Sequence, residues 1–429
     1  MNIVYVHQHF STTRGTTGTR SYDFARMLVE RGHRVTVLTG VYGPSEFARR
    51  RFTRLVTRLD VDGIDVRIVN VRYDNKQSSA RRILAFLAFM FLSTREALRI
   101  RDADVVFATS TPLTTGFVGM VARYARRVPF VFEVRDIWPE SAVQFGALKN
   151  PLLIFVAAAW ERMFYHAAGC IVAISPRMAE RLRARLGSQA RKVHVIPLGA
   201  DYGLFARAEP DLAWRHEHGL EGKVVAVYAG AHGRVNALSW VLEAAARLKD
   251  LPDVRFVLIG DGVLKPRLTE QAQALGLQNV LFLAPVPKER LAAILKACDL
   301  GLMTLDNYPV FDTALPNKFM DYLAAGLPVL LNFDGQAGWL AEEEGCGVVV
   351  PPEDPEAMAE AIRDLAGDAA RRREMGRRAQ VVAKHRFDRR RLVEVFEATL
   401  AGARVTGPGP IGALPAPTGG ARTSPYGPA

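Results

Sequence analysis

Short apolar runs alternate with helical segments along almost the whole chain, and this alternation constrains the fold more than any other feature. Ile3–His7 is a short apolar run, Ser21–Arg31 carries apolar residues at helical spacing, and Arg34–Leu38 is apolar again. Strand–helix–strand units of this kind build parallel sheets, whose strands are buried on both faces. The other predicted strands of this half are Val105–Ala108, Phe130–Val134 and Cys170–Ile174.

The alternation begins again after residue 223 and predicts a second sheet. Its predicted strands are Val224–Tyr228, Arg255–Ile259, Val280–Leu283, Leu300–Met303, Val329–Leu331 and Val348–Val350. Its predicted helices are Leu238–Lys249, Arg267–Gly276, Glu289–Ala297, Asn317–Ala325 and Asp354–Ala366. Open parallel sheets bind ligands beyond the carboxyl ends of their strands, so the cleft between the two halves is the predicted site.

We therefore predict an α/β fold of two Rossmann-like, doubly wound domains that face a cleft. The first is expected to span residues 1–200 and the second residues 201–385, with Pro197–Asp211 as the linker. Residues 386–402 contain a helical stretch that we expect to pack back toward the first domain. Residues 403–429 are rich in Gly, Pro, Ala and Thr without apolar periodicity, which predicts a disordered tail.

Neither a metal centre nor a membrane span is predicted. The three cysteines form no disulfide framework or zinc-binding spacing, and a reducing compartment suits them best. No apolar run reaches the ~20 residues that a spanning helix needs. The N-terminus lacks a basic start followed by an apolar core, so it is predicted to be a strand rather than a signal peptide.

Positive charge is concentrated in the first quarter of the chain. Residues 1–102 hold 18 Lys and Arg against nine Asp and Glu, which accounts for +9 of the net charge of +12. This asymmetry implies an anionic partner: lipid headgroups, a polyprenyl phosphate or nucleic acid. Within residues 81–101, arginines flank the apolar block Ile83–Leu92, which is either a core helix or a segment that lies in the interface of an anionic membrane.

The stretch that begins at Pro316 predicts an anion site. Pro316 is suited to opening a helix, and Asn317 and Lys318 occupy its first turn, where free backbone N–H groups favour an anion such as a diphosphate. Lys318 would add a point charge. Asp321 follows one turn later and is expected to face the same way.

Two loops are expected to approach the same ligand. The loop that starts at Gly230 follows a buried strand and contains Arg234 and Asn236, and Lys265 comes after the next strand. In the first half, Gly18 stands at the start of a helix within RGTTGTR. This stretch is not G-x-G-x-x-G, and no P-loop pattern occurs, so a dehydrogenase or P-loop enzyme is poorly supported.

Asp136 is the strongest candidate in the first half. It follows a buried strand, so it is aimed at the cleft, although Glu133 and Arg135 are close enough in sequence to hold it in a structural ion-pair network. His7 also ends a strand there. Asp60-Val61-Asp62 resembles a metal-binding D-x-D, but it reads better as a hairpin with its turn at Asp62-Gly63.

Five stretches together resemble the family-four retaining glycosyltransferases with the GT-B fold, and within them the bacterial transferases of surface-polysaccharide assembly. The resemblance covers residues 1–402 and rests on GTRSYDFARMLVERGHRVTVLTG, FEVRDIWPES, VHVIPLGAD, VAVYAGAHGRVNAL and LPNKFMDYLAAGLPVL. It implies transfer of a sugar from a nucleoside diphosphate sugar, without cofactor or metal, to a glycan or polyprenyl-diphosphate-linked acceptor. Together with the Ile83–Leu92 block, its flanking arginines and the charge of residues 1–102, it predicts a cytoplasmic enzyme that is peripheral at the inner face of the plasma membrane.

The resemblance assigns roles to individual residues. Asp136 and Lys318 would be catalytic, and His7, Arg20 and Asp136 would lie on the acceptor side. The donor would be held by Gly18, Gly230, Arg234, Asn236, Lys265, Pro316, Asn317, Lys318 and Asp321.

The chain departs from the family pattern at several of these positions. The usual E-x7-E is Thr313 and Asp321, with Asp321 at the ribose-binding position, and Thr17 replaces the first of two paired glycines. The two cations usual in the second glycine-rich loop are Ala231 and Asn236, so Arg234 or Lys265 is the expected substitute.

Two other functions remain open at this stage. One is a nucleotide-sugar epimerase or hydrolase on the same fold. The other is a non-catalytic, basic nucleic-acid-binding protein, although the aromatic residues near the arginines form one apolar block instead of separate base-stacking positions.

Overall fold

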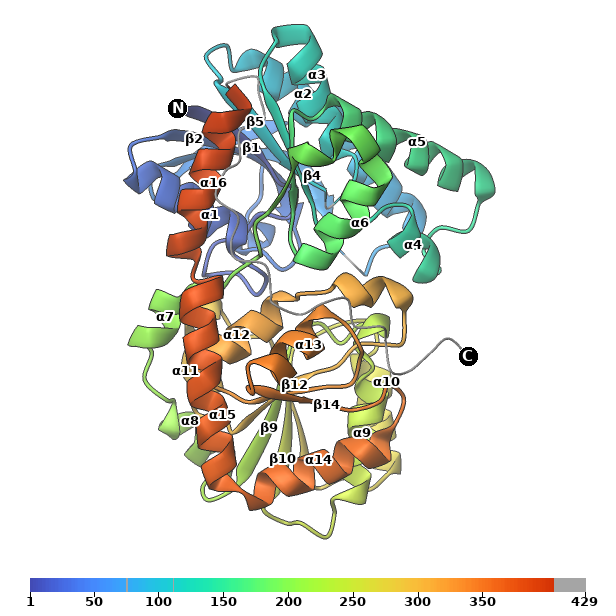
Figure 1. The fold of residues 1–429 in the computed structure, drawn as a ribbon, viewed down its shortest axis with the longest axis vertical. Helices are drawn as coiled ribbons and strands as arrows, with labels where there is room; N and C mark the ends of the chain where they lie inside the picture. The colour runs from blue at the N-terminus through green and yellow to red at the C-terminus, as the bar shows by residue number, and fades with distance from the viewer. Residues whose placement is uncertain (75, 111, 405–429) are drawn as a thin grey trace.

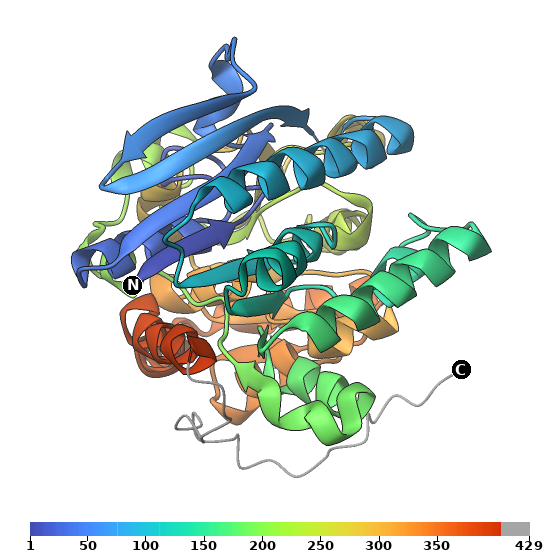
Figure 2. The same ribbon diagram turned by 90° about the horizontal axis from the view of Figure 1, so that it is seen from above.

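Two α/β domains lie one above the other in the computed structural model, which describes residues 1–74, 76–110 and 112–404 (Figure 1). The first domain contains an eight-stranded sheet and the second a six-stranded sheet. Helices cover both faces of each sheet, as Figure 2 shows from above. The predicted fold class is confirmed, and the short apolar runs are strands because only a doubly covered sheet buries both of their faces.

The first sheet has the order β3-β4-β2-β1-β5-β6-β7-β8, and all neighbours are parallel except β3 and β4. Its strands are β1 (Asn2–Val6), β2 (Arg34–Tyr42), β3 (Val56–Val61), β4 (Ile64–Tyr73), β5 (Val105–Thr109), β6 (Phe130–Val134), β7 (Cys170–Ala173) and β8 (Val193–Val195). Its helices are α1 (Arg20–Glu30), α2 (Ser79–Arg99), α3 (Thr115–Arg126), α4 (Glu140–Gln144), α5 (Pro151–Ala167) and α6 (Pro176–Leu186).

The second sheet is parallel throughout, with the order β11-β10-β9-β12-β13-β14. Its strands are β9 (Val224–Ala229), β10 (Val254–Ile259), β11 (Val280–Leu283), β12 (Leu300–Met303), β13 (Val329–Leu331) and β14 (Gly347–Val349). Its helices are α7 (Tyr202–Arg207), α8 (Leu212–Glu217), α9 (Leu238–Arg247), α10 (Lys265–Ala274), α11 (Lys288–Lys296), α12 (Asn317–Ala325), α13 (Gln336–Glu343), α14 (Pro355–Gly367) and α15 (Ala369–Val382). The strand order reverses between β9 and β12, the point where doubly wound sheets bind ligands.

The chain crosses between the domains twice, and the two crossings lie side by side. Ala200 pairs with Asp388 in a parallel bridge, and the Arg389 amide donates to the Ala200 carbonyl at 3.1 Å. The last helix, α16 (Arg389–Arg404), then runs along α1 of the first domain (Figure 1). Its Phe396 packs on Phe24 and Phe107, with ring centroids 4.9 and 4.7 Å apart.

Several elements differ from the expectations, among them α7, α8, α13, α15 and β8. Helix α7 lies inside the predicted linker, because Asp201 caps a short helix by accepting a hydrogen bond from the Leu204 amide. Helix α15 and strand β8 were not predicted: α15 is arginine-rich with weak apolar periodicity, and β8 has only three residues. Residues 405–429 of the predicted tail lie outside the described residues, while its first two residues complete α16.

The hairpin prediction at Asp62-Gly63 is confirmed. Strands β3 and β4 pair antiparallel, and Asp62 and Gly63 have φ angles of 52° and 80°, as a tight hairpin turn requires. The Asp62 carboxylate accepts a hydrogen bond from the Tyr22 hydroxyl at 2.6 Å. In the described part of the chain, no group of three or more His, Cys, Asp or Glu is placed to hold a metal ion.

The block Ile83–Leu92 lies on α2 and is divided between core and surface. Phe89 and Met90 are buried, whereas Leu84 is 66% exposed and Phe91 is 61% exposed. The block is therefore a core helix along one face, and its other face is exposed. Within the described ranges, no helix is both long and apolar enough to cross a membrane.

Candidate active site between the domains

A cavity of about 410 Å³ lies between the two domains, at the carboxyl ends of both sheets. His7 and His9 follow β1, Asp136 follows β6, Leu305 follows β12 and Lys318 is on α12; all five line the cavity. Parallel strands place these residues together because their carboxyl ends share one edge of each sheet. The predicted cleft and several of the predicted site residues thus coincide in one pocket.

Lys318 presents a cation with only neutral partners. Its Nζ donates to the Tyr228 hydroxyl and to Asn236 Oδ1, both at 2.9 Å, and lies 4.4 Å from the centre of the Tyr228 ring. Among the described residues, no carboxylate forms an ion pair with this amine. Burial lowers the pKa of Lys318 to about 7, so the site favours the neutral amine until an anion arrives.

The start of α12 faces a loop of the first domain. A Cβ added to Gly18 would lie 3.1 Å from Asn317 Nδ2, so the absence of a side chain lets the two domains approach here. Pro316 caps the helix in an extended conformation, and Asn317 Oδ1 is buried without a partner. Gly18, Pro316, Asn317 and Lys318 all line the cavity, which leaves the first N–H groups of α12 beside it.

Asp321 does not face the cavity beside Lys318, contrary to the expectation from helical spacing. Its Oδ2 forms a buried ion pair with Lys288 of α11, and both side chains are 8% exposed. Its Oδ1 is buried and has no partner. Asp321 is therefore held on the α11 side of α12, with one oxygen still able to accept a hydrogen bond.

The expected substitute cations do not line the cavity either. Lys265 Nζ donates to the carbonyls of Gly260 and Leu283, both at 2.7 Å, so it closes the ends of two strands. Arg234 lines a separate outer hollow of about 640 Å³ between α9 and α10. In the loop that starts at Gly230, Asn236 lines the cavity. Gly230 lies against Lys318, because a Cβ added to this glycine would stand 3.4 Å from Lys318 Cε.

Two of the three residues predicted for the acceptor side line the cavity. Asp136 and His7 line the cavity; His7 Nδ1 is 2.7 Å from Ser21 Oγ, and burial holds the pKa of His7 well below its usual value. The His9 ring stacks against both Tyr42 and Tyr73, and burial lowers its pKa to about 3. Both histidines are therefore neutral at physiological pH.

Arg20 does not belong to the acceptor side, because it is a structural residue. It is 2% exposed and pairs with Glu133 at 2.8 Å. It also donates to the carbonyls of Ile196 and Pro197, where the chain leaves the first domain. Glu133 is thus the partner of Arg20, although it had been a candidate partner for Asp136.

Sequence reasoning missed Tyr228 and Lys288, which contact Lys318 and Asp321, and the apolar residues Phe145, Val310 and Phe311 of the cavity wall. Tyr228 is the last residue of a predicted strand, so its position near the ligand edge was available as a signal. Nothing in the local sequence marks the other four.

Two family models match the chain in succession. The Glycosyl transferase 4-like domain matches residues 15–199, and the Glycosyl transferases group 1 domain matches residues 211–382. WcaI of Escherichia coli K12, described as a colanic acid biosynthesis glycosyl transferase, is 32% identical over 85% of this chain and 91% of its own. The chain therefore belongs to the glycosyltransferase family that these two domains and WcaI represent.

Further relatives agree with this assignment. WbjE of Pseudomonas aeruginosa, described as a glycosyltransferase, is 26% identical over 68% of this chain and 73% of its own. Among solved structures, HepE of Anabaena in complex with UDP covers 94% of this glycosyltransferase with a TM-score of 0.70 and 20% identity. WaaG, a glycosyltransferase of lipopolysaccharide biosynthesis, covers 93% with a TM-score of 0.65 and 15% identity. These likenesses show that the enzyme has the GT-B fold.

Proposed function

We propose that this glycosyltransferase moves a sugar from a nucleoside diphosphate sugar to a polyprenyl-diphosphate-linked glycan during assembly of a bacterial surface polysaccharide. The observation that carries the proposal is Lys318: a cation with neutral partners, beside the open N-terminus of α12, in the cavity between the domains. A diphosphate supplies the negative charge that this arrangement lacks. UDP and UDP-glucose are bound in structures of HepE, which shares the fold.

The proposed reaction proceeds with retention at the anomeric carbon. The acceptor hydroxyl attacks from the face that the diphosphate leaves, and its proton passes to the departing phosphate. Lys318 and the N–H groups of α12 stabilise the charge that develops on that phosphate. Asp136, which lines the cavity, contacts the acceptor hydroxyl.

Leaving-group stabilisation by the chain's own cation and helix would make the reaction independent of divalent metal. Activity is therefore expected to survive an excess of EDTA. An enzyme that EDTA silences and Mg²⁺ or Mn²⁺ restores would contradict this part of the proposal.

A panel of nucleoside diphosphates and their sugars, followed by calorimetry and mass spectrometry, tests the donor. We expect one nucleoside diphosphate to bind and its sugar to be transferred to a membrane-extracted acceptor. Rapid turnover of the donor without acceptor would instead favour an epimerase or hydrolase on the same fold.

The membrane-binding surface that we propose is broader than the α2 block alone. Helices α2 and α5 both pack on α3 and extend toward the same side in Figure 2. Phe155 of α5 is 71% exposed, Leu84 and Phe91 of α2 are similarly exposed, and Arg81 and Arg95 are exposed beside them. We propose that this apolar and basic surface, together with the charge of residues 81–101, binds the anionic inner face of the plasma membrane.

Flotation with phosphatidylglycerol vesicles tests this surface. The triple variant Leu84→Ser/Phe91→Ser/Phe155→Ser should remain in the soluble fraction, while Leu212→Ser, an equally exposed change on α8 of the other domain, should float like the wild type. Higher salt should weaken binding, because ~0.15 M salt screens charges beyond ~8 Å. Wild-type protein that fails to float at low salt would point to a soluble acceptor.

A further inference from the structure

We propose that the transferred sugar carries a methyl group, as a 6-deoxy or an N-acetylated sugar does, and that a wall formed by α4 and the 3-10 helix η4 (Pro309–Thr313) selects it. This inference deepens the proposed function and rests on it. It concerns the part of the cavity beyond the diphosphate site, where Phe145, Val310 and Phe311 had not been singled out from the sequence.

The wall begins where the diphosphate site ends. Residues 314–316 connect η4 to α12, and all three line the cavity together with Thr313 and Lys318. In the donor, the sugar is joined directly to the diphosphate. The nucleoside is joined to the other end of the diphosphate, and our proposal puts the sugar end into the space that η4 and α4 border.

The side chains of this wall are apolar. Val310 and Phe311 come from η4, Phe145 follows α4, and Ile137 precedes it; Met178 of α6 completes the surface. Phe145 and Phe311 pack together with ring centroids 5.4 Å apart. A methyl group gains contact with such a surface, whereas a hydroxyl loses its water without replacement.

The polar groups of the wall already have protein partners. Thr313 Oγ1 donates to the Val310 carbonyl at 3.2 Å, and Ser141 Oγ donates to the Ile137 carbonyl at 3.0 Å. The Val310 amide donates to Gln144 Oε1 at 2.9 Å. Among the described residues that line the cavity, Asp136 alone carries a carboxylate, and the proposed mechanism uses it for the acceptor.

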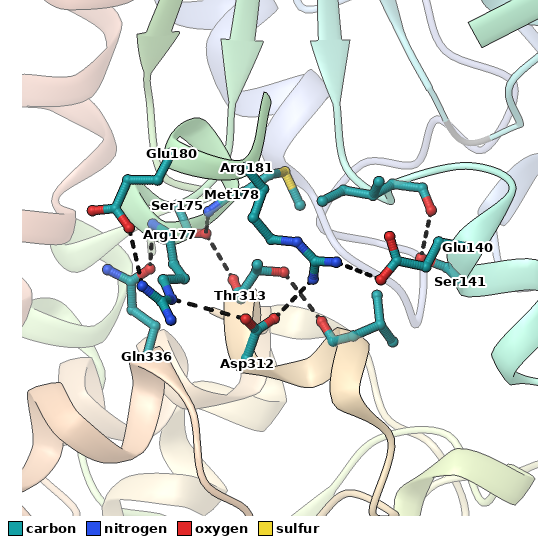
Figure 3. A network of polar contacts seen from close by, with 12 residues as sticks. Glu140, Ser141, Ser175, Arg177, Met178, Glu180, Arg181, Asp312, Thr313 and Gln336 are labelled. Atoms are coloured by element: carbon teal, nitrogen blue, oxygen red, sulfur yellow. Dashed lines mark hydrogen bonds and ion pairs between the residues drawn. The ribbon is translucent and has the colours of Figure 1, made fainter. Parts of the chain in front are cut away.

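The wall is also fixed in place, as Figure 3 shows. Arg181 of α6 lies between Glu140 and Asp312, with an Nη1–Oδ1 distance of 3.1 Å to Asp312. Ser175 Oγ donates to the Thr313 carbonyl at 2.7 Å. Because η4 is tied to the first domain at both residues, it does not readily turn to offer new polar groups to a fully hydroxylated sugar.

The test measures how much each sugar adds to the binding of its nucleoside diphosphate. Calorimetry gives the Kd of the nucleoside diphosphate that binds. It also gives the Kd of the same nucleoside diphosphate joined to a fully hydroxylated hexose, a 6-deoxyhexose or an N-acetylhexosamine. The ratio of the first Kd to the second is the contribution of each sugar. An apolar pocket discriminates by about 10- to 200-fold for each methylene-sized group. We expect at least one methyl-bearing donor to exceed the plain hexose by about 10-fold, and the last two sugars tell which methyl is recognised.

Two variants at one position sharpen the result. Thr313→Glu adds a hydrogen-bonding carboxylate to the wall. It should strengthen binding of the plain hexose donor and so bring its Kd close to that of the methyl-bearing donor. Thr313→Val keeps the shape and should retain the preference. Equal ratios for the three sugars in the wild type would overturn the inference while leaving the proposed function intact, and failure of every nucleoside diphosphate to bind would overturn the proposed function itself.

Discussion

Two regions of the molecule surround a positively charged side chain in opposite ways. At the crossing between the domains, Arg389 is 1% exposed and forms an ion pair with Asp23, and it also donates to Thr19 Oγ1 at 2.9 Å and to the Leu198 carbonyl at 3.2 Å. Arg20 is paired with Glu133 in the same manner. In the cavity, Lys318 has only a phenol and an amide oxygen as partners.

This difference separates a structural cation from a binding cation. A buried ion pair that is also hydrogen-bonded neutralises itself, so nothing further is required of it. A partly buried amine without a counter-charge loses part of its hydration and is compensated only when an anion binds. Burial alone therefore does not distinguish a ligand-binding cation from a structural one. The absence of a carboxylate partner does.

The largest effect is expected from breaking the pair at the crossing. Arg389→Met leaves the Asp23 carboxylate buried and unpaired, which should lower the free energy of unfolding by ~3–5 kcal/mol. Denaturant titration measures this loss, and calorimetry on the protein that remains folded should show unchanged affinity for nucleoside diphosphate.

The double variant Arg389→Met/Asp23→Asn is the matched control. It removes both charges and should recover part of the lost stability. If the single variant unfolds at the same denaturant concentration as the wild type, the pair is not structural and the comparison fails.

Lys318→Met should have the opposite profile. Loss of the charge-assisted contact is expected to weaken nucleoside diphosphate binding by ~1.5–3 kcal/mol, about 10- to 150-fold. Stability at pH 6 should be unchanged or higher, because a desolvated charge has been removed. Calorimetry and denaturant titration on the same preparation measure both quantities, and a large loss of stability with normal binding would assign Lys318 to the structural class.

Proton uptake sharpens the comparison further. The pKa of Lys318 is lowered to about 7 in the folded protein, so at pH 8 most molecules hold the neutral amine, and a bound diphosphate should raise that pKa. Binding at pH 8 is then expected to take up close to one proton, measured by calorimetry in two buffers of different ionisation enthalpy. Uptake should shrink below pH 7 and vanish in Lys318→Met; uptake that persists in the variant would belong to another group.

The same pKa predicts a stability trend in the free protein. The unfolded chain holds the Lys318 proton up to about pH 10.4, whereas the folded chain releases it near pH 7. The unfolded state therefore binds more protons between these values, and the contribution of this group to stability should rise with pH across that window. Comparing wild type with Lys318→Met between pH 7 and 10 isolates the trend.

The smallest effect is expected at the two cations that the cavity excludes. Lys265→Ala and Arg234→Ala should each change nucleoside diphosphate affinity by less than about 0.5 kcal/mol. Lys265→Ala should still lower stability by ~1 kcal/mol, because two strand-end carbonyls lose their donor. A loss of affinity comparable to that of Lys318→Met would show that these residues do bind the donor.

Strand and helix positions were predictable because they follow from local periodicity. The runs at Phe130–Val134 and Val280–Leu283 and the helix Asn317–Ala325 occur with the predicted bounds. Parallel topology then made it predictable that Asp136, His7 and Lys318 would meet, since strand ends share one edge.

Side-chain partners were not predictable in the same way, because partners come from elements distant in the sequence. Asp321 and Lys318 have helical spacing, yet Lys288 of α11 holds Asp321 on one side and Tyr228 of β9 engages Lys318 on the other. Arg20 shares its motif with Gly18, but packing turns its side chain inward to Glu133 and the crossing strand.

By itself, the sequence of this glycosyltransferase determined two doubly wound domains, a cleft between them and a helix N-terminus poised for an anion. Only the tertiary structure decided which charges are neutralised by other parts of the chain and which remain for a ligand. The physical reason is range: backbone periodicity is set by neighbours a few residues apart, whereas the balance of a buried charge is set by whatever the fold brings within a few ångströms of it.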